Sequence, residues 1–185
     1  IAAWSLSSGA FSLVDWAIFD PSWSVLALHD PVAVDVGGPG LAVAGDGDGG
    51  LRALATDASG ELGPTVVSVD LPQGTGRIHA IAQDSAGRLH FAHGPGAGIG
   101  SVDPAQAGAP GTVLQDTQGL YAADVFRLET VARAGAEYLL AASASEAGVS
   151  AFRIEDSGLT PTSALGAGEG LGVMVPTAME VVETG

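Results

Sequence analysis

Three short segments with a similar pattern each carry one side chain that could bind a cation or a polar ligand. His79 lies in RIHAI, Glu129 in RLETV and Glu180 in AMEVV, and Asp35 lies in a comparable segment nearer the N-terminus. If these segments are the inner strands of successive β-units, the four side chains line a shared axial channel. We therefore predict a channel-lining or ligand-binding set, for which a hydrated lining without a ligand is the alternative explanation.

A glycine-rich loop at residues 45–50, GDGDGG, carries two carboxylates. Its form is G-x-G-x-x-G, but Asp46 and Asp48 would repel a phosphate, and a strand rather than a helix is predicted after the loop. Both features argue against dinucleotide binding. Carboxylate oxygens are ligands that calcium prefers, so Asp46 and Asp48 are candidate Ca²⁺ ligands, and Ca²⁺ is the one cofactor we expect. A solvated hairpin turn explains the same loop without a metal.

The sequence gives little indication of catalysis. It contains no G-x-S-x-G, H-E-x-x-H or S-x-x-K motif, and it has no lysine, which excludes Schiff-base and P-loop chemistry. His90 and His93 are three residues apart on a predicted strand, so they lie on opposite faces and do not suit a metal pair. We therefore predict no catalytic residue and no hydrolase activity from this chain.

The elements that would position these side chains recur with a period of about 50 residues. Residues 40–65 match 138–162 at about two periods, and 77–103 form a middle copy that places His79 level with Glu129. Each copy contains short apolar or alternating strands, separated by turns rich in Gly, Asp and Ser. Such a period with four short strands per copy is typical of β-propeller blades. Chance similarity in a chain rich in Ala and Gly is the alternative.

We therefore predict an all-β fold, a partial β-propeller made of four-stranded antiparallel blades of about 50 residues. It would form one domain over residues 1–185. Its expected parts are the later strands of an incomplete blade at 1–30, complete blades at 31–70, 77–116 and 126–166, and the inner strand of a further blade at 176–185.

The predicted strands that define these blades most clearly are 41–45, 51–55, 88–93, 99–103, 138–143 and 149–154. The two ends of the chain would supply complementary strands of one blade, so a closed four-bladed ring is one arrangement. An arc cut from a larger ring is the other, and we expect the open arc, with the segments 3–28 and 177–182 far apart.

Composition limits the partners. Six Arg, no Lys and 21 acidic residues give a net charge of −15, which argues against nucleic acids and anionic membrane surfaces. No apolar run reaches the roughly 18 residues that a membrane helix needs, so we expect no membrane insertion. The absence of Cys excludes disulfides and thiol chemistry. The acidic composition is typical of a saline or extracellular setting, and the start at Ile1 leads us to expect further blades or domains of a longer protein.

The blade segments AEYLLAASASEAGVSAFRIEDSGLTP (136–161) and TAMEVVETG (177–185) resemble those of lactonase-like, seven-bladed β-propellers. They are also similar to propeller regions of secreted bacterial calcium-binding proteins of the repeats-in-toxin kind, over most of residues 31–185. This resemblance implies a secreted, extracellular or periplasmic scaffold for binding or adhesion, without enzymatic activity, whose ligand is a protein or a carbohydrate. It implies, as an alternative, a lactonase-like hydrolase that uses channel carboxylates and a divalent metal. The glycine-rich calcium nonapeptide of the second group is absent from this chain.

Overall fold

The fold is built from β-strands. The computed structural model describes residues 2–7, 10–16, 29–35, 39–44, 50–57, 61–70, 78–93, 98–103, 106, 112–172 and 177–181. None of these residues is α-helical, and the longest helical element among them is the 3₁₀ turn Ala167–Glu169. The described part of the chain accordingly contains no helix of the length and apolarity needed to cross a membrane.

The strands form three four-stranded antiparallel sheets, here called blades, and one separate hairpin. The N-terminal blade consists of β3 (His29–Asp35), β4 (Pro39–Ala44), β5 (Gly50–Thr56) and β6 (Leu62–Asp70). The middle blade consists of β7 (Ile78–Gln83), β8 (Leu89–His93), β9 (Gly98–Val102) and β10 (Thr112–Leu114). The C-terminal blade consists of β11 (Val125–Arg133), β12 (Ala136–Ser143), β13 (Gly148–Glu155) and β14 (Gly158–Leu165). The hairpin pairs β1 (Ala2–Ser7) with β2 (Ala10–Trp16).

Within each blade, strands that follow one another in the chain are neighbours in the sheet. Ala134 and Gly135 connect β11 to β12 with φ values of 52° and 76°, the geometry of a hairpin turn whose twist matches that of the strands. Asp84 shapes the β7–β8 turn differently, because its Oδ1 accepts hydrogen bonds from the backbone N–H groups of Ala86 and Arg88.

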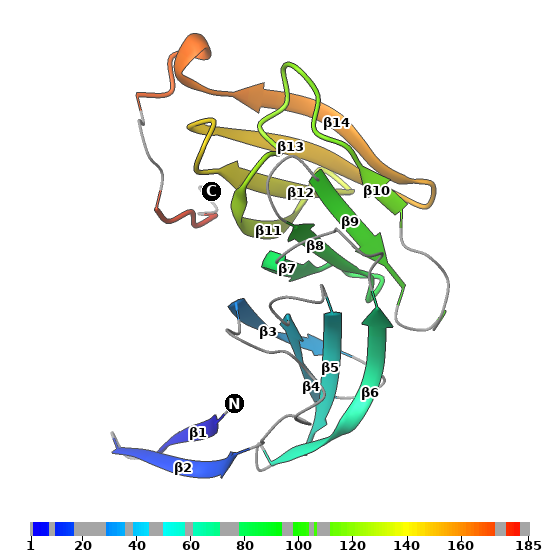
Figure 1. Ribbon diagram of the computed structural model, residues 1–185, viewed down its shortest axis with the longest axis vertical. Coiled ribbons are helices and arrows are strands. Elements are labelled where there is room, and N and C mark those ends of the chain that lie inside the picture. The colour runs from blue at the N-terminus through cyan, green and yellow to red at the C-terminus, as the bar shows by residue number, and fades with distance from the viewer. Residues whose placement is uncertain are drawn as a thin grey trace.

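The three blades stand side by side in an arc, with the inner strands β3, β7 and β11 in contact and the outer strands β6, β10 and β14 facing outward (Figure 1). This is the blade arrangement of a β-propeller. The prediction of an all-β, partial propeller with four-stranded antiparallel blades is therefore confirmed, and all six predicted strands are present.

The arc is open. The hairpin β1–β2 lies at one end, and the C-terminal segment 177–181 lies at the other, beside β11 (Figure 1). Residues 177–181 adopt no strand, although the sequence predicted an inner strand there. A strand needs a neighbour to share its ladder, and no described strand is placed to pair with this segment.

Among the described residues, one hydrophobic core lies between the middle and C-terminal blades. Ala80, Ala92 and Ile99 of the middle blade pack against the face of the C-terminal blade that carries Leu139 and Phe152. These five side chains are almost fully buried. Burial of apolar area at this interface holds the two blades together, since each ladder is internal to one blade.

The ladder register aligns the two blades differently from the sequence pattern. His79 lies in a β-bulge at the start of β7, and Phe126 lies in the corresponding bulge of β11. His79 therefore corresponds to Phe126, while Ala82 corresponds to Glu129. The sequence pattern aligned His79 with Glu129, which lies three residues beyond the structural match of His79. The difference arises because β11 and β12 form three more residue pairs before their turn than β7 and β8 do. The pairing of β7 with β8 ends at Gln83 and Leu89, where the Asp84–Arg88 turn begins.

Candidate functional site

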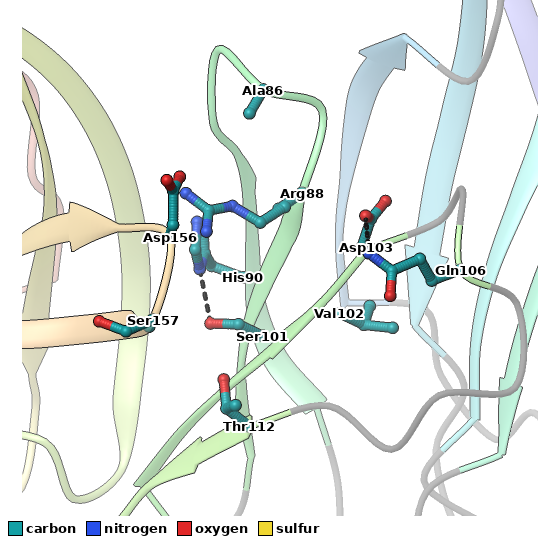
Figure 2. Close-up of a pocket in the computed structure, with 11 residues that line it drawn as sticks. Ala86, Arg88, His90, Ser101, Val102, Asp103, Gln106, Thr112, Asp156 and Ser157 are labelled. Atoms are coloured by element: carbon teal, nitrogen blue, oxygen red, sulfur yellow. Dashed lines mark hydrogen bonds between the residues drawn. The ribbon is translucent and has the colours of Figure 1, made fainter.

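A polar pocket of about 420 Å³ lies between the middle blade and the β13–β14 turn of the C-terminal blade (Figure 2). Its floor carries His90, Ser101 and Thr112, which stand directly opposite one another on β8, β9 and β10. Asp156 and Ser157 face this row from the β13–β14 turn (Figure 2). The pocket therefore combines groups from two blades, and it exists only while these blades are packed together.

The floor residues His90 and Ser101 belong to a buried series of hydrogen bonds that continues to Asp84. The Nδ1 atom of His90 is 2.8 Å from the Oγ atom of Ser101, and its Nε2 atom is 3.3 Å from Oδ2 of Asp84. The exposed fractions of Asp84, His90 and Ser101 are 5%, 1% and 8%. Water therefore cannot replace these partners, and the imidazole holds the Ser101 hydroxyl in one orientation at the pocket wall.

The Asp84 carboxylate supplies the negative charge of this hydrogen-bonded series. Burial by itself would raise the pKa of this carboxyl, but hydrogen bonds from His90 and Arg88 outweigh burial and lower the pKa from 3.8 to about 2. Asp84 is consequently ionised at neutral pH. Its four donors are the ring of His90, the Nε of Arg88 at 2.7 Å, and the backbone N–H groups of Ala86 and Arg88.

Arg88, which lines the pocket, forms hydrogen bonds with both blades. Its Nε donates to Asp84 in the middle blade, and its Nη1 donates to the carbonyl oxygen of Glu155 in the C-terminal blade at 2.7 Å. Nearby, the backbone N–H and the hydroxyl of Ser85 both donate to the carboxylate of Glu137, at 2.8 and 2.5 Å. These contacts fix the separation of the blades at the mouth of the pocket.

The remaining pocket groups can reach a ligand. Asp156 is exposed, and its carboxylate has no hydrogen-bond partner among the described residues. Gln106 donates to Asp103 at 2.8 Å beyond the end of β9 (Figure 2). The lining includes the carboxylates of Asp103 and Asp156 and the guanidinium of Arg88, so its negative charges outnumber its positive ones.

The order carboxylate, imidazole, hydroxyl is also that of a serine nucleophile with its base. Two features of the site differ from such an enzyme. Asp84 divides its two oxygens among four donors, which the β7–β8 turn requires. Ser101 lies in the middle of a three-strand ladder, whereas a nucleophilic serine needs free donors beside it that stabilise an oxyanion. The geometry suits an oriented hydroxyl that contacts a ligand better than one that attacks it.

The predicted channel set is only partly brought together. His79 is partly exposed, and its Nδ1 lies 3.8 Å from Oδ1 of Asp124. Glu129 accepts a hydrogen bond of 3.0 Å from the Nε of Arg127, and Glu129 and Glu180 line a second cavity of about 630 Å³ beside β11. His79 does not line that cavity.

The structure describes Asp35 of the channel set but not the two aspartates of the glycine-rich loop. Asp35 is the last residue of the inner strand β3. Asp46 and Asp48 lie outside the described residues. Within the described residues, no group of three or more His, Cys, Asp or Glu side chains is arranged to hold a metal ion.

The sequence pattern missed the chain of Asp84, His90 and Ser101. Both strands that carry His90 and Ser101 were predicted, but not their register, which places these two residues directly opposite each other. A β8–β9 hairpin closed between His93 and Gly98 gives that pairing. The signal was therefore present in the strand pair rather than in any linear motif.

Comparison with known proteins does not identify a family. No protein-family model matches the chain, and no curated protein matches its sequence. The resemblance to lactonase-like and repeats-in-toxin propellers therefore stays a prediction. The fold is that of an open β-propeller arc, and its function has to be inferred from the site itself.

Proposed function

We propose that the protein is a non-enzymatic binding module whose pocket between the middle and C-terminal blades holds a neutral, hydroxyl-rich ligand such as a glycan. The observation that carries this proposal is the buried chain from Asp84 through His90 to Ser101, which presents an oriented hydroxyl at the pocket wall. A hydroxyl held in place before binding loses little entropy when it contacts a ligand.

The lining supports this ligand class. Thr112, Ser157 and Ser101 offer hydroxyls, Asp156 offers an unpaired carboxylate, and Arg88 offers a guanidinium that two blades hold in place. Vicinal hydroxyls both donate and accept, so they match such a mixed lining. The excess of negative charge disfavours phosphates and nucleotides, and the polar walls disfavour apolar ligands.

The direct test is binding of the purified chain to a panel of immobilised neutral oligosaccharides. We expect one saccharide class to be retained, with binding at least about tenfold weaker in Asp156→Ala and Thr112→Val. Both residues are exposed, so the melting temperatures should stay close to that of the unmodified chain. Glu180→Gln, outside the pocket, is the matched control and should bind normally. Absence of any saccharide binding, or binding that both pocket variants retain, would contradict the proposal.

A lactonase-like hydrolase is the second candidate, and the contact between His90 and Ser101 is what favours it. In that case the Ser101 hydroxyl attacks the lactone carbonyl, its proton passes to His90, and water then releases the ring-opened acid. Lactone hydrolysis that Ser101→Ala abolishes would support this candidate. Loss of hydrolysis in Glu129→Gln would instead assign catalysis to the channel carboxylates, and no hydrolysis at all is the result expected of a binding module.

The proposal includes a location outside the cytoplasm and association with calcium as part of a larger protein. The net charge of −15 supports the first, because an acidic surface stays soluble in saline surroundings. Asp46 and Asp48 in their glycine-rich loop support the second. A protein or a carbohydrate remains the expected partner, and the saccharide panel distinguishes the two.

A further inference from the structure

The direction of each hydrogen bond in the series from Asp84 through His90 to Ser101 follows from its Asp84 end. Oδ1 of Asp84 accepts from the backbone N–H groups of Ala86 and Arg88, and Oδ2 accepts from the Nε of Arg88 at 2.7 Å. The carboxyl is ionised at neutral pH and carries no proton of its own. Its contact of 3.3 Å with Nε2 of His90 is therefore a hydrogen bond in which Nε2 carries the proton.

The other ring nitrogen of His90, Nδ1, carries no proton at neutral pH. Arg88 already balances the negative charge of Asp84, and among the described residues Asp84 is the one acidic side chain in contact with the ring. His90 is almost fully buried, so a second proton on the ring would place a positive charge in the interior without a counterion. The neutral ring with its proton on Nε2 leaves a lone pair on Nδ1.

The Ser101 hydroxyl is then the donor in its contact with His90. Its Oγ lies 2.8 Å from Nδ1 (Figure 2), and a hydroxyl has a single proton to give. The Ser101 side chain makes no other hydrogen bond with the residues that the structure describes. Its Oγ therefore presents lone pairs to the pocket and has no proton left for a ligand.

Two further groups of the lining are either acceptors or donors but not both. The carboxylate of Asp156 accepts only, and it has no hydrogen-bond partner among the described residues. Arg88 donates only, and its Nη2 has no partner in the described part of the chain, whereas Nε and Nη1 are bonded to Asp84 and Glu155. A ligand that satisfies the lining donates at Ser101 and Asp156 and accepts at Arg88. Hydroxyl groups do both, whereas an ammonium group cannot accept and an ether oxygen cannot donate.

We propose that Ser101 determines the specificity of this pocket, because it accepts a hydrogen bond from one free hydroxyl of a sugar and has no proton to offer to any other group. The inference rests on the proposed function and adds to it which partner donates. A hydroxyl that buried partners hold in one orientation cannot turn to offer its proton instead. The recognised sugar therefore needs a free hydroxyl at one ring position, and replacement of that hydroxyl should weaken binding.

The tautomer of His90 is the first test. Long-range proton–nitrogen correlation spectra of the isotope-labelled chain at pH 7 report on both ring nitrogens. We expect the resonance of a protonated Nε2 and that of an unprotonated Nδ1. A proton on Nδ1 would overturn the proposal, because Ser101 would then accept from the ring and keep its own proton for a ligand.

The second test compares the methyl glycosides of glucose, galactose and mannose with their deoxyfluoro analogues in isothermal titration calorimetry. Fluorine is close in size to a hydroxyl group but has no proton to donate. For a glycoside that binds, we expect fluorine at one ring position to weaken binding at least about tenfold. Ser101→Ala should remove this difference, whereas Thr112→Val, the matched control on the adjacent strand, should keep it. Binding that no single fluorine substitution weakens would overturn the proposal.

The two tests separate this inference from the proposed function. The tautomer is measured without a ligand, so it supports or overturns the acceptor role of Ser101 even if no glycoside binds, a result that would contradict the proposed function alone. Ser101→Ala leaves Nδ1 of His90 without a donor, which lowers stability and can prevent folding. The spectrum and the fluorine comparison are both made on the unmodified chain and remain decisive in that case.

Discussion

Replacing Asp84 by asparagine tests whether the buried carboxylate holds the pocket together. The substitution keeps the size of the side chain and removes its charge, so the charge-assisted hydrogen bonds with Arg88 and His90 are lost. The pKa of Asp84 is lowered from 3.8 to about 2, and this change corresponds to about 2.5 kcal/mol of folding stability at neutral pH. We expect Asp84→Asn to lose about that much at pH 7.

The sign of the pH dependence follows from the lowered pKa. The folded state favours the ionised form, so the contribution of Asp84 is complete above the unfolded pKa of 3.8 and disappears as the pH falls through about 2. By pH 3 about 1 kcal/mol of it should already be lost. The difference in stability between the unmodified chain and Asp84→Asn should therefore shrink from pH 7 to pH 3.

Urea unfolding followed by circular dichroism at the two pH values measures this difference. Other acidic groups titrate alike in both proteins and cancel in the comparison. Asp156→Asn is the matched control, because it removes an exposed carboxylate from the same pocket, and its effect should stay within about 0.5 kcal/mol. A stability difference that is the same at pH 7 and pH 3 would refute the assignment of a lowered pKa to Asp84.

Three further predictions concern the packing and the calcium loop. Phe152→Ala should cost about 3–5 kcal/mol in urea unfolding, because the ring is fully buried between two blades. Gly148→Ala should cost about 1–3 kcal/mol, because a Cβ atom there would overlap the ring of Tyr121, whereas Gly168→Ala, with open space around it, should be neutral in the same assay. Ca²⁺ should raise the melting temperature and Mg²⁺ should not, and substitution of both aspartates in the loop 45–50 should remove that rise.

The fold could be predicted from the sequence because its signal is repeated. Short apolar runs bounded by turn residues recur in each blade, and β12, with EYLLAAS inside it, shows the pattern most clearly. Register could not be predicted in the same way. The β11–β12 hairpin is longer than β7–β8 by three pairs, and a constant spacing between copies cannot detect an extension inside a hairpin.

The candidate site could be predicted only in fragments. His90 was visible as a histidine on a strand, but Asp84 reads as an ordinary turn residue and Ser101 as an ordinary strand residue. Their relation depends on a turn that folds Asp84 back toward His90 and on cross-strand pairing with Ser101. Such contacts come from packing in three dimensions, which strand propensity alone does not encode.

The confinement of every described ladder to a single blade has a mechanical consequence. Neighbouring blades are joined by side-chain packing and by a few hydrogen bonds, such as those of Arg88 with Glu155 and of Thr130 with Gln83. Tension applied along the chain would therefore peel one blade from the next before it broke the ladders within the remaining blades. Release of the C-terminal blade, residues 125–165, would lengthen the chain by up to roughly 140 Å at about 3.4 Å per residue. An arc of this kind can yield to a pull in steps of one blade and reform when the load is removed.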